Sequence, residues 1–208
     1  MGLTYKFLEM EKLLNNIIDT SVPFAWSHGA KDEYLGTGLM YYSLIYINKL
    51  VNVLIFGTGG GFVPSIIRQA HNDLNIGKIT IVDNLSGIGD ESNHARQTYR
   101  KIKNNFVWHK TSTEDFCISY FKKPPIVYFD YIHIDANHDF EYVYTDLKYG
   151  WKMLKTGGFI TVHDTDINSG LTGPNSAVKY FITNQKAEIL NIFTENSNGL
   201  TILRKINQ

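Results

Sequence analysis

The sequence predicts an α/β protein built on a doubly wound, mostly parallel sheet of seven strands with an antiparallel C-terminal strand. Short runs rich in β-branched residues alternate with amphipathic segments along most of the chain. A cluster of glycines directly follows the first of these runs. The last two runs flank Asn198-Gly199, which is typical of a hairpin and predicts an antiparallel strand at an edge of the sheet.

The strands are predicted from apolar runs that end in turn-forming residues. In chain order they cover residues 53–56, 78–84, 106–110, 130–137, 159–164, 188–194 and 199–205.

The helices are predicted from apolar residues spaced three and four apart. Pro64 suits a first turn, residues 90–105 run from acidic to basic, and residues 111–121 begin with a Ser/Thr–Glu capping pattern. A Thr-Gly-Gly sequence is expected to close the helix at residue 154. In chain order the helices cover residues 39–50, 63–74, 90–105, 111–121, 140–154 and 174–185.

The whole chain, 1–208, reads as one domain, with a core at 51–208 and an N-terminal helical segment at 1–50. The N-terminal segment is a candidate lid. Two roles remain open for its aromatic residues, which are either core side chains or part of an acceptor wall: Trp26, Tyr34, Tyr41 and Tyr42.

Composition narrows the class of protein. Twenty Lys and Arg balance twenty Asp and Glu, which argues against a broad surface for nucleic acid. Cys117 is the only cysteine, which excludes an intrachain disulfide and suits a reducing compartment. No run approaches about 18 apolar residues, and no signal peptide is recognisable. We therefore expect a cytoplasmic protein without a membrane span, and homo-oligomerisation is left open.

The stretch VLIFGTGGGF, residues 53–62, predicts a buried strand followed by a turn with accessible backbone amides. No Gly-Lys-Ser/Thr follows, which excludes a P-loop. The dinucleotide pattern G-x-G-x-x-G would place Phe62 at its third glycine, where close packing requires glycine. Asp83 ends the next strand, where a carboxylate can bind ribose hydroxyls. Alternatively, the glycines only make a tight turn and Asp83 caps the following loop.

VLIFGTGGG followed by ITIVDN resembles the first two motifs of class I S-adenosylmethionine-dependent methyltransferases. The stretch DYIHIDANHDFEYVYTDLKYGWKMLKTGGFITVHD is similar to a branch related to the catechol-type and macrolide-sugar O-methyltransferases. GLTILRK resembles the last strand of that branch. The resemblance covers roughly residues 35–205. It implies a Rossmann-like fold and methyl transfer from S-adenosylmethionine to a small hydroxylated acceptor, such as a sugar or a phenol.

The resemblance also implies a cofactor site along the carboxyl ends of the strands. The glycine turn would pass beneath the methionine part, Asp83 would bind the ribose, and the turn after the third strand would contact adenine. The residues implied are Gly57, Thr58, Gly59, Gly61, Asp83, Ser112, Thr113 and Asp135.

In the catechol-type relatives, two carboxylates and a following Asn bind magnesium. The matching residues here are Asp135, Asp164 and Thr165, with Asp166 or His163 as substitutes for the missing Asn. Oxygen ligands favour Mg²⁺ or Ca²⁺ over zinc. Alternatively, Asp135 contacts the cofactor and Asp164 is bound by backbone amides.

His138 stands where the catechol-type relatives carry a lysine as general base. A histidine with a near-neutral pKa can take the proton from the acceptor hydroxyl, with Asp135 and His163 as further catalytic candidates. The alternatives are that His138 bonds to Asp139 at a helix start and that His163 is packed at a strand end.

Two departures from the family pattern keep other functions open. Ile55 replaces a Glu that orients the cofactor, and Thr165 replaces the Asn, so a catalytically inactive cofactor-binding protein remains an alternative. An NAD(P)-dependent oxidoreductase is disfavoured by Phe62 and by the absence of a Tyr-x-x-x-Lys pair in the right region. Nucleic-acid methylation is disfavoured by the charge balance and by the lack of an Asn/Asp-Pro-Pro-Tyr/Phe motif.

Overall fold

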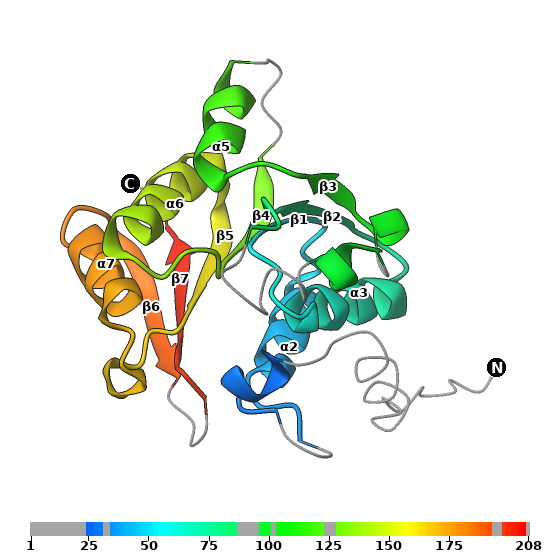
Figure 1. Cartoon of the computed structure of the whole chain (residues 1–208), viewed down its shortest axis with the longest axis horizontal. Coiled ribbons are helices and arrows are strands. Elements are labelled where there is room, and N and C mark those ends of the chain that lie inside the picture. The colour runs from blue at the N-terminus through cyan, green and yellow to red at the C-terminus, as the bar shows by residue number, and fades with distance from the viewer. Residues whose placement is uncertain are drawn as a thin grey trace.

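The computed structural model describes residues 24–30, 34–86, 96–100, 103–122, 128–192 and 197–206. The predicted N-terminal helix before residue 24 lies outside the described residues, as does part of the predicted helix at 90–105. Seven strands form one sheet in the order β3-β2-β1-β4-β5-β7-β6 (Figure 1). The predicted doubly wound, mostly parallel sheet is therefore confirmed.

The strands lie close to their predicted positions. They are β1 (Asn52–Phe56), β2 (Lys78–Val82), β3 (Val107–His109), β4 (Phe129–Ile134), β5 (Leu154–His163), β6 (Ala187–Ile192) and β7 (Leu200–Lys205). The α-helices are α2 (Gly38–Asn48), α3 (Phe62–Leu74), α5 (Thr113–Phe121), α6 (Phe140–Met153) and α7 (Thr172–Ile182). Three short 3-10 turns are η1 (Phe24–Ser27), η2 (Lys103–Asn105) and η3 (Ile167–Ser169).

The edge strand at this end of the sheet is paired antiparallel, as the hairpin predicted. The strand that runs against the rest of the sheet, however, lies one position inside the edge. β7 runs antiparallel between β5 and β6, and β6 forms the edge. Burial follows this order, because the first four residues of β7 are buried whereas Glu188, Ile189 and Leu190 of β6 are exposed.

β5 begins at Leu154, five residues before the predicted start of the strand. The Thr-Gly-Gly sequence therefore lies inside the strand instead of closing α6. The pairing of β4 with β5 shifts register between Phe129 and Tyr131. A Cβ on Gly158 would lie 2.8 Å from the carbonyl oxygen of Asp130, so glycine permits the close approach of the two strands here.

Helices cover both faces of the sheet, and each face carries its own core (Figure 1). Along β1 the side chains alternate, because Val53 and Ile55 join the core beneath α2 and α3 whereas Leu54 and Phe56 face the opposite core. Ile55 is fully buried, so the position at which the resemblance implies a Glu is occupied here by a core residue.

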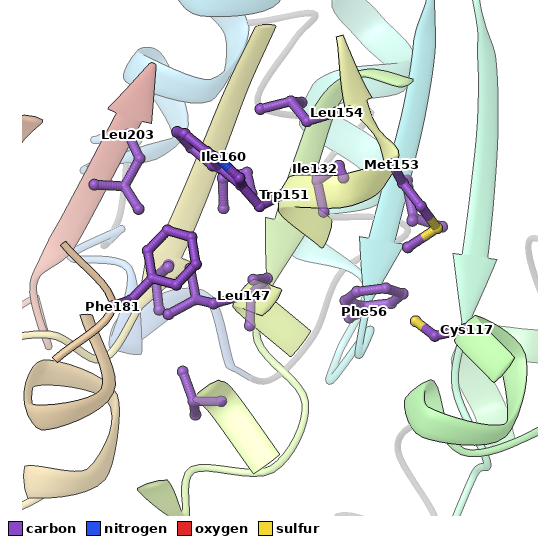
Figure 2. Close-up of a cluster of buried hydrophobic side chains, with 14 of the residues drawn as sticks. Phe56, Cys117, Ile132, Leu147, Trp151, Met153, Leu154, Ile160, Phe181 and Leu203 are labelled. Atoms are coloured by element: carbon purple, nitrogen blue, oxygen red, sulfur yellow. The ribbon is translucent and has the colours of Figure 1, made fainter. Parts of the chain in front are cut away.

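The second core lies between the sheet and α6 and α7. Figure 2 shows Ile132 and Ile160 of the sheet with Leu147 and Trp151 of α6 and Phe181 of α7. Burial of each large apolar side chain contributes about 1.5–3 kcal/mol, which anchors the carboxyl ends of β4 and β5.

The N-terminal aromatic residues divide between core and surface. Tyr41 and Tyr42 are buried in the core around α2. Trp26 and Tyr34 are 60% and 65% exposed, so they are not core residues. No helix among the described residues is long and apolar enough to cross a lipid bilayer. Location in the cytoplasm and self-association stay predictions from the sequence.

Candidate active site

The sheet changes its winding direction between β1 and β4, and the residues that follow these strands meet there. Gly57 follows β1 with a φ of 81°, and a Cβ at this position would lie 2.0 Å from the carbonyl oxygen of Asp135. Only glycine fits this close approach. The glycine turn and the residue that follows β4 are therefore in direct contact.

Hydrogen bonds to Asp83 hold the glycine turn against the end of β2. Its Oδ2 accepts hydrogen bonds from the backbone N–H of Thr58, at 2.9 Å, and from the Thr58 hydroxyl, at 2.7 Å. Its Oδ1 accepts one from the backbone N–H of Leu85, at 2.7 Å. Asp83 thus caps the following loop, as the alternative interpretation proposed. Oδ1 keeps a lone pair, so the ribose contact stays a prediction.

The turn after β3 is part of a helix cap. The Oγ of Ser112 accepts a hydrogen bond from the backbone N–H of Asp115, at 3.1 Å, and donates one to the Asp115 carboxylate, at 2.8 Å. Thr113 faces Asp146 of α6, a fully buried carboxylate. Burial raises the pKa of Asp146 to about 7, and the Thr113 hydroxyl only partly opposes this. The predicted adenine contacts of Ser112 and Thr113 remain predictions.

Four imidazoles surround the carboxylate of Asp135. The Nε2 of His138 and the Nδ1 of His163 lie 3.4 Å from its Oδ1. The Nε2 atoms of His133 and His28 lie 3.8 and 3.9 Å from its Oδ2. The side chain of Asp135 is 21% exposed, so this polar cluster lies at the wall of the site.

Asp164 joins the cluster from the end of β5. Its Oδ2 lies 3.0 Å from the Nε2 of His138, and its Oδ1 lies 3.3 Å from the Nδ1 of His163. The residue is buried and has a φ of 58°, in the left-handed region that an aspartate adopts only at some cost. The structure therefore brings together four of the predicted residues: Asp135, His138, His163 and Asp164.

The protonation of His138 differs from the sequence-based expectation. Burial by itself would lower the pKa of His138, but the hydrogen bonds and charges of Asp135 and Asp164 outweigh it and raise this pKa to about 10. The same balance raises the pKa of His163 to about 10. The pKa of His138 therefore lies above the near-neutral value expected from the sequence, and the role of this residue as a base stays a prediction.

Thr165 and Asp166 have other partners. The buried hydroxyl of Thr165 is hydrogen bonded to the hydroxyl of Thr201 on β7, at 3.0 Å. Asp166 caps η3 by accepting hydrogen bonds from the backbone and side-chain amides of Asn168. The structure does not bring these two residues into the cluster around Asp135.

Sequence reasoning missed two members of the cluster, His28 and His133. A signal existed for His133, because it stands two residues before Asp135 on one strand and therefore faces the same side of the sheet. No local signal existed for His28. It reaches the site from the segment 24–30, which is joined to the C-terminal hairpin by an isolated antiparallel bridge between His28 and Ser197.

The fold and this site define a Rossmann-like methyltransferase. Residues 54–165, more than half of the chain, match the family model described as a methyltransferase domain, and the chain belongs to that family. The resemblance to class I methyltransferases, seen in the glycine turn and in residues 130–164, is confirmed.

Solved structures with the same fold support this assignment. The O-methyltransferase TomG from Streptomyces achromogenes, involved in tomaymycin synthesis and solved with SAM, is 14% identical with a TM-score of 0.67; the match covers 99% of this chain and 92% of TomG. An O-methyltransferase from Bacillus cereus, solved with SAH, is 16% identical with a TM-score of 0.63, over 98% and 93% of the two chains.

The methyltransferase PaMTH1 from Podospora anserina, solved with SAH, is 15% identical with a TM-score of 0.62, and the match covers 100% of both chains. At these identities the similarity shows the fold. No curated protein matches the chain by sequence.

Proposed function

We propose that this methyltransferase transfers the methyl group of S-adenosylmethionine to a hydroxyl oxygen of a small acceptor, such as a sugar or a phenol. The observation that carries the proposal is the contact between Gly57 and the backbone of Asp135. It joins a nucleotide-binding turn directly to a cluster of proton-binding groups. The complexes of TomG and the Bacillus cereus enzyme with SAM and SAH support the choice of cofactor.

The residues around the glycine turn fit a nucleoside cofactor. Gly59 and Gly61 have φ values of 45° and 89°, which bend the backbone into a tight turn. The amides of Thr58 and Gly61 are hydrogen bonded within the protein, and Gly59 is the exposed residue of the turn. Asp83 offers the remaining lone pair of Oδ1 to a ribose hydroxyl. Leu85 has a φ of 56°, and strain of this kind is concentrated at functional sites.

S-adenosylmethionine supplies a methyl group already activated as a sulfonium, so the acceptor oxygen displaces S-adenosylhomocysteine in line and only its proton needs a base. His138 is the imidazole of the cluster that an acceptor can reach. Its side chain is 39% exposed, whereas those of His28, His133 and His163 are 5%, 1% and 1% exposed. We therefore assign His138 as the general base.

The raised pKa of His138 sets a condition on this role. The ring holds a proton as long as Asp135 and Asp164 have no other cation to balance their charge. It accepts the acceptor's proton only in a state in which those carboxylates share their charge with another positive group. Competence as a base is therefore tied to occupancy of the site.

The test combines binding with turnover. Chelator-treated protein is titrated calorimetrically with S-adenosylhomocysteine, and transfer from methyl-labelled S-adenosylmethionine is then measured against sugars, phenols, amines and thiols. Micromolar binding and label on a hydroxylated acceptor support the proposal. Binding without transfer to any acceptor would favour a cofactor-binding protein, and absence of binding would overturn the cofactor assignment, with NADH as the next ligand.

A further inference from the structure

The histidines around Asp135 offer a different set of possible ligands from the oxygen ligands that the family resemblance implies. Magnesium and calcium take oxygen ligands, but the atoms that face Asp135 are imidazole nitrogens and the hydroxyl of Thr165 is bonded to Thr201. We propose that His28, Asp135 and His163 bind a divalent first-row transition ion of the Zn²⁺ or Fe²⁺ type. This deepens the proposed function, because the site lies beside His138, but ion binding is measured without turnover.

The spacing of the donor atoms fits one ion. One ligand atom each from His28, Asp135 and His163 lie within 4.8 Å of one another. Two atoms bound about 2.0–2.2 Å from a tetrahedral ion lie about 3.4 Å apart. The Nδ1 of His163 lies 3.4 Å from Asp135 Oδ1, and the Nε2 of His28 lies 3.9 Å from Oδ2. Such distances give poor direct hydrogen bonds but suit two ligands of one ion.

The outer nitrogen of each imidazole already has a protein partner. The Nε2 of His163 donates to the backbone carbonyl of Ser27, at 3.1 Å, which leaves Nδ1 facing Asp135. The Nδ1 of His28 lies 3.3 Å from the hydroxyl of Tyr41, which leaves Nε2 facing Asp135. Metal-binding histidines are oriented in this way, with the distal nitrogen bonded to the protein.

His28 is held in place although it comes from a distant part of the chain. Its carbonyl accepts hydrogen bonds from the backbone N–H of Thr37, at 2.8 Å, and from the Thr37 hydroxyl, at 3.1 Å. A Cβ on Gly36 would lie 2.1 Å from that carbonyl, so the turn is built around it. The ring of His28 stacks on His163 with the ring centres 3.9 Å apart. These contacts hold His28 beside Asp135, and a shared ion requires the two rings to tilt away from the 28° angle between their planes.

Buried polar atoms without a hydrogen-bond partner give independent support. The Nε2 of His133, in a fully buried side chain, forms no hydrogen bond and faces Asp135 Oδ2 at 3.8 Å. The Oδ1 of Asp164, also buried, has no hydrogen bond of good geometry and lies 3.3 Å from the Nδ1 of His163, with which it forms an ion pair when that ring is protonated. Burial of such atoms costs about 1–3 kcal/mol each, and a shared cation would remove this cost.

The donor set defines the class of ion. Two imidazoles and one carboxylate suit zinc and iron, whereas Mg²⁺ retains waters and oxygen ligands. Three protein ligands leave coordination positions open, as in catalytic sites, on the side where His138 is part-exposed. An ion there would polarise an acceptor hydroxyl and lower its pKa.

Co²⁺ is the probe, because its visible absorption reports nitrogen ligation directly. Chelator-treated full-length protein is titrated with Co²⁺, and excess Mg²⁺ is then added as a competitor. We expect one Co²⁺ per chain that Mg²⁺ does not displace. X-ray absorption of the Zn²⁺-loaded protein should show imidazole scattering. Displacement by Mg²⁺, an all-oxygen shell, or no ion bound would overturn the proposal.

Variants identify the ligands. His28→Gln and His163→Gln should each weaken Co²⁺ binding by at least about tenfold. His109→Gln, on exposed β3, is the matched control and should bind Co²⁺ like the wild type. Circular dichroism checks that each variant folds, and the wild-type experiments with Mg²⁺ and X-ray absorption do not depend on any variant. Unchanged Co²⁺ affinity in folded His28→Gln would exclude this ligand set.

The outcome is separable from the proposed function. Titration with S-adenosylhomocysteine is run on the same metal-free and Co²⁺-loaded protein. Co²⁺ binding without binding of S-adenosylhomocysteine would support the metal site and contradict the proposed function. Binding of S-adenosylhomocysteine without Co²⁺ would do the opposite.

Discussion

Asp83 and Asp135 follow the two strands that flank β1, and they meet the same edge of the sheet with different partners. The carboxylate of Asp83 is bound by backbone amides and a hydroxyl at 2.7–2.9 Å. The carboxylate of Asp135 is surrounded by imidazoles at 3.4–3.9 Å. The first carboxylate is held by short hydrogen bonds to neutral groups, whereas the second is balanced by imidazoles that can gain or lose a proton.

From this difference we infer separate tasks for the two halves of the proposed site. Hydrogen bonds from Thr58 and Leu85 fix a turn whose shape does not depend on the state of the protein. Imidazoles and carboxylates change charge, so the half around Asp135 is the part of the edge that responds to ligands and protons. We expect substitutions in the first half to change affinity and those in the second to change turnover.

Asp146 extends the comparison to a buried carboxylate whose oxygens have no hydrogen bond of good geometry, so the nearby hydroxyl of Thr113 offsets the effect of burial only in part. Its pKa is raised from 3.8 to about 7, so the folded protein holds this proton more tightly than the unfolded chain. Stability is therefore lost as the pH rises from about 4 through about 7. Asp146→Asn should raise the free energy of unfolding by about 4 kcal/mol near pH 8, at about 1.4 kcal/mol per pKa unit, and by little near pH 4.

Urea denaturation of both proteins at the two pH values measures this effect. Asp115→Asn, at an exposed position on α5, serves as the control and should show no such pH-dependent gain. Equal stability of Asp146→Asn and the wild type near pH 8 would mean that the carboxylate has a partner that the structure does not reveal.

The half around Asp135 is tested at His138. His138→Gln keeps a polar side chain but removes the group that binds a proton. Turnover should fall by about 100-fold, because general bases contribute about 10²–10⁴-fold. Affinity for S-adenosylhomocysteine should remain at the wild-type value, and His109→Gln should retain full activity. A fall of less than about threefold would exclude His138 as the base.

The half around Asp83 should show the opposite pattern. Asp83→Ala removes the bonds to Thr58 and Leu85 and the proposed ribose acceptor. Binding of S-adenosylhomocysteine should weaken by about 1–3 kcal/mol, the cost of leaving polar groups unpaired. Calorimetry measures the change, with Glu188→Ala on the exposed edge strand β6 as the control. Unchanged affinity would remove Asp83 from the cofactor site.

The smallest change in stability is expected at Leu85, in the loop that Asp83 caps. Its φ of 56° is unfavourable for a residue with a branched side chain, so Leu85→Gly should stabilise the fold by up to about 1 kcal/mol. Asn75→Gly at the C-terminus of α3, with a φ of 54°, should gain less because Asn tolerates this conformation. Thermal melting of both variants would show whether the strain at Leu85 is real.

Features set by residues close together in the sequence could be predicted, whereas contacts between residues far apart in the sequence could not. Strands and helices were predictable because their periodicity is local, and so was Asp83, which directly follows a strand. His28 was not, because its place is set by Thr37 and by the bridge to Ser197 at the far end of the chain. The raised pKa of His138 was equally hidden, because it requires Asp135 and Asp164 to converge in space.

One backbone atom connects the C-terminal hairpin to the proposed chemistry. The carbonyl of Ser27 accepts hydrogen bonds from the backbone N–H of Asn198, at 2.9 Å, and from the ring of His163. Every amino acid carries this carbonyl, so no substitution at position 27 deletes it. A substitution at position 27 should therefore leave the orientation of His163 unchanged, because the path of the backbone places the carbonyl that the ring binds.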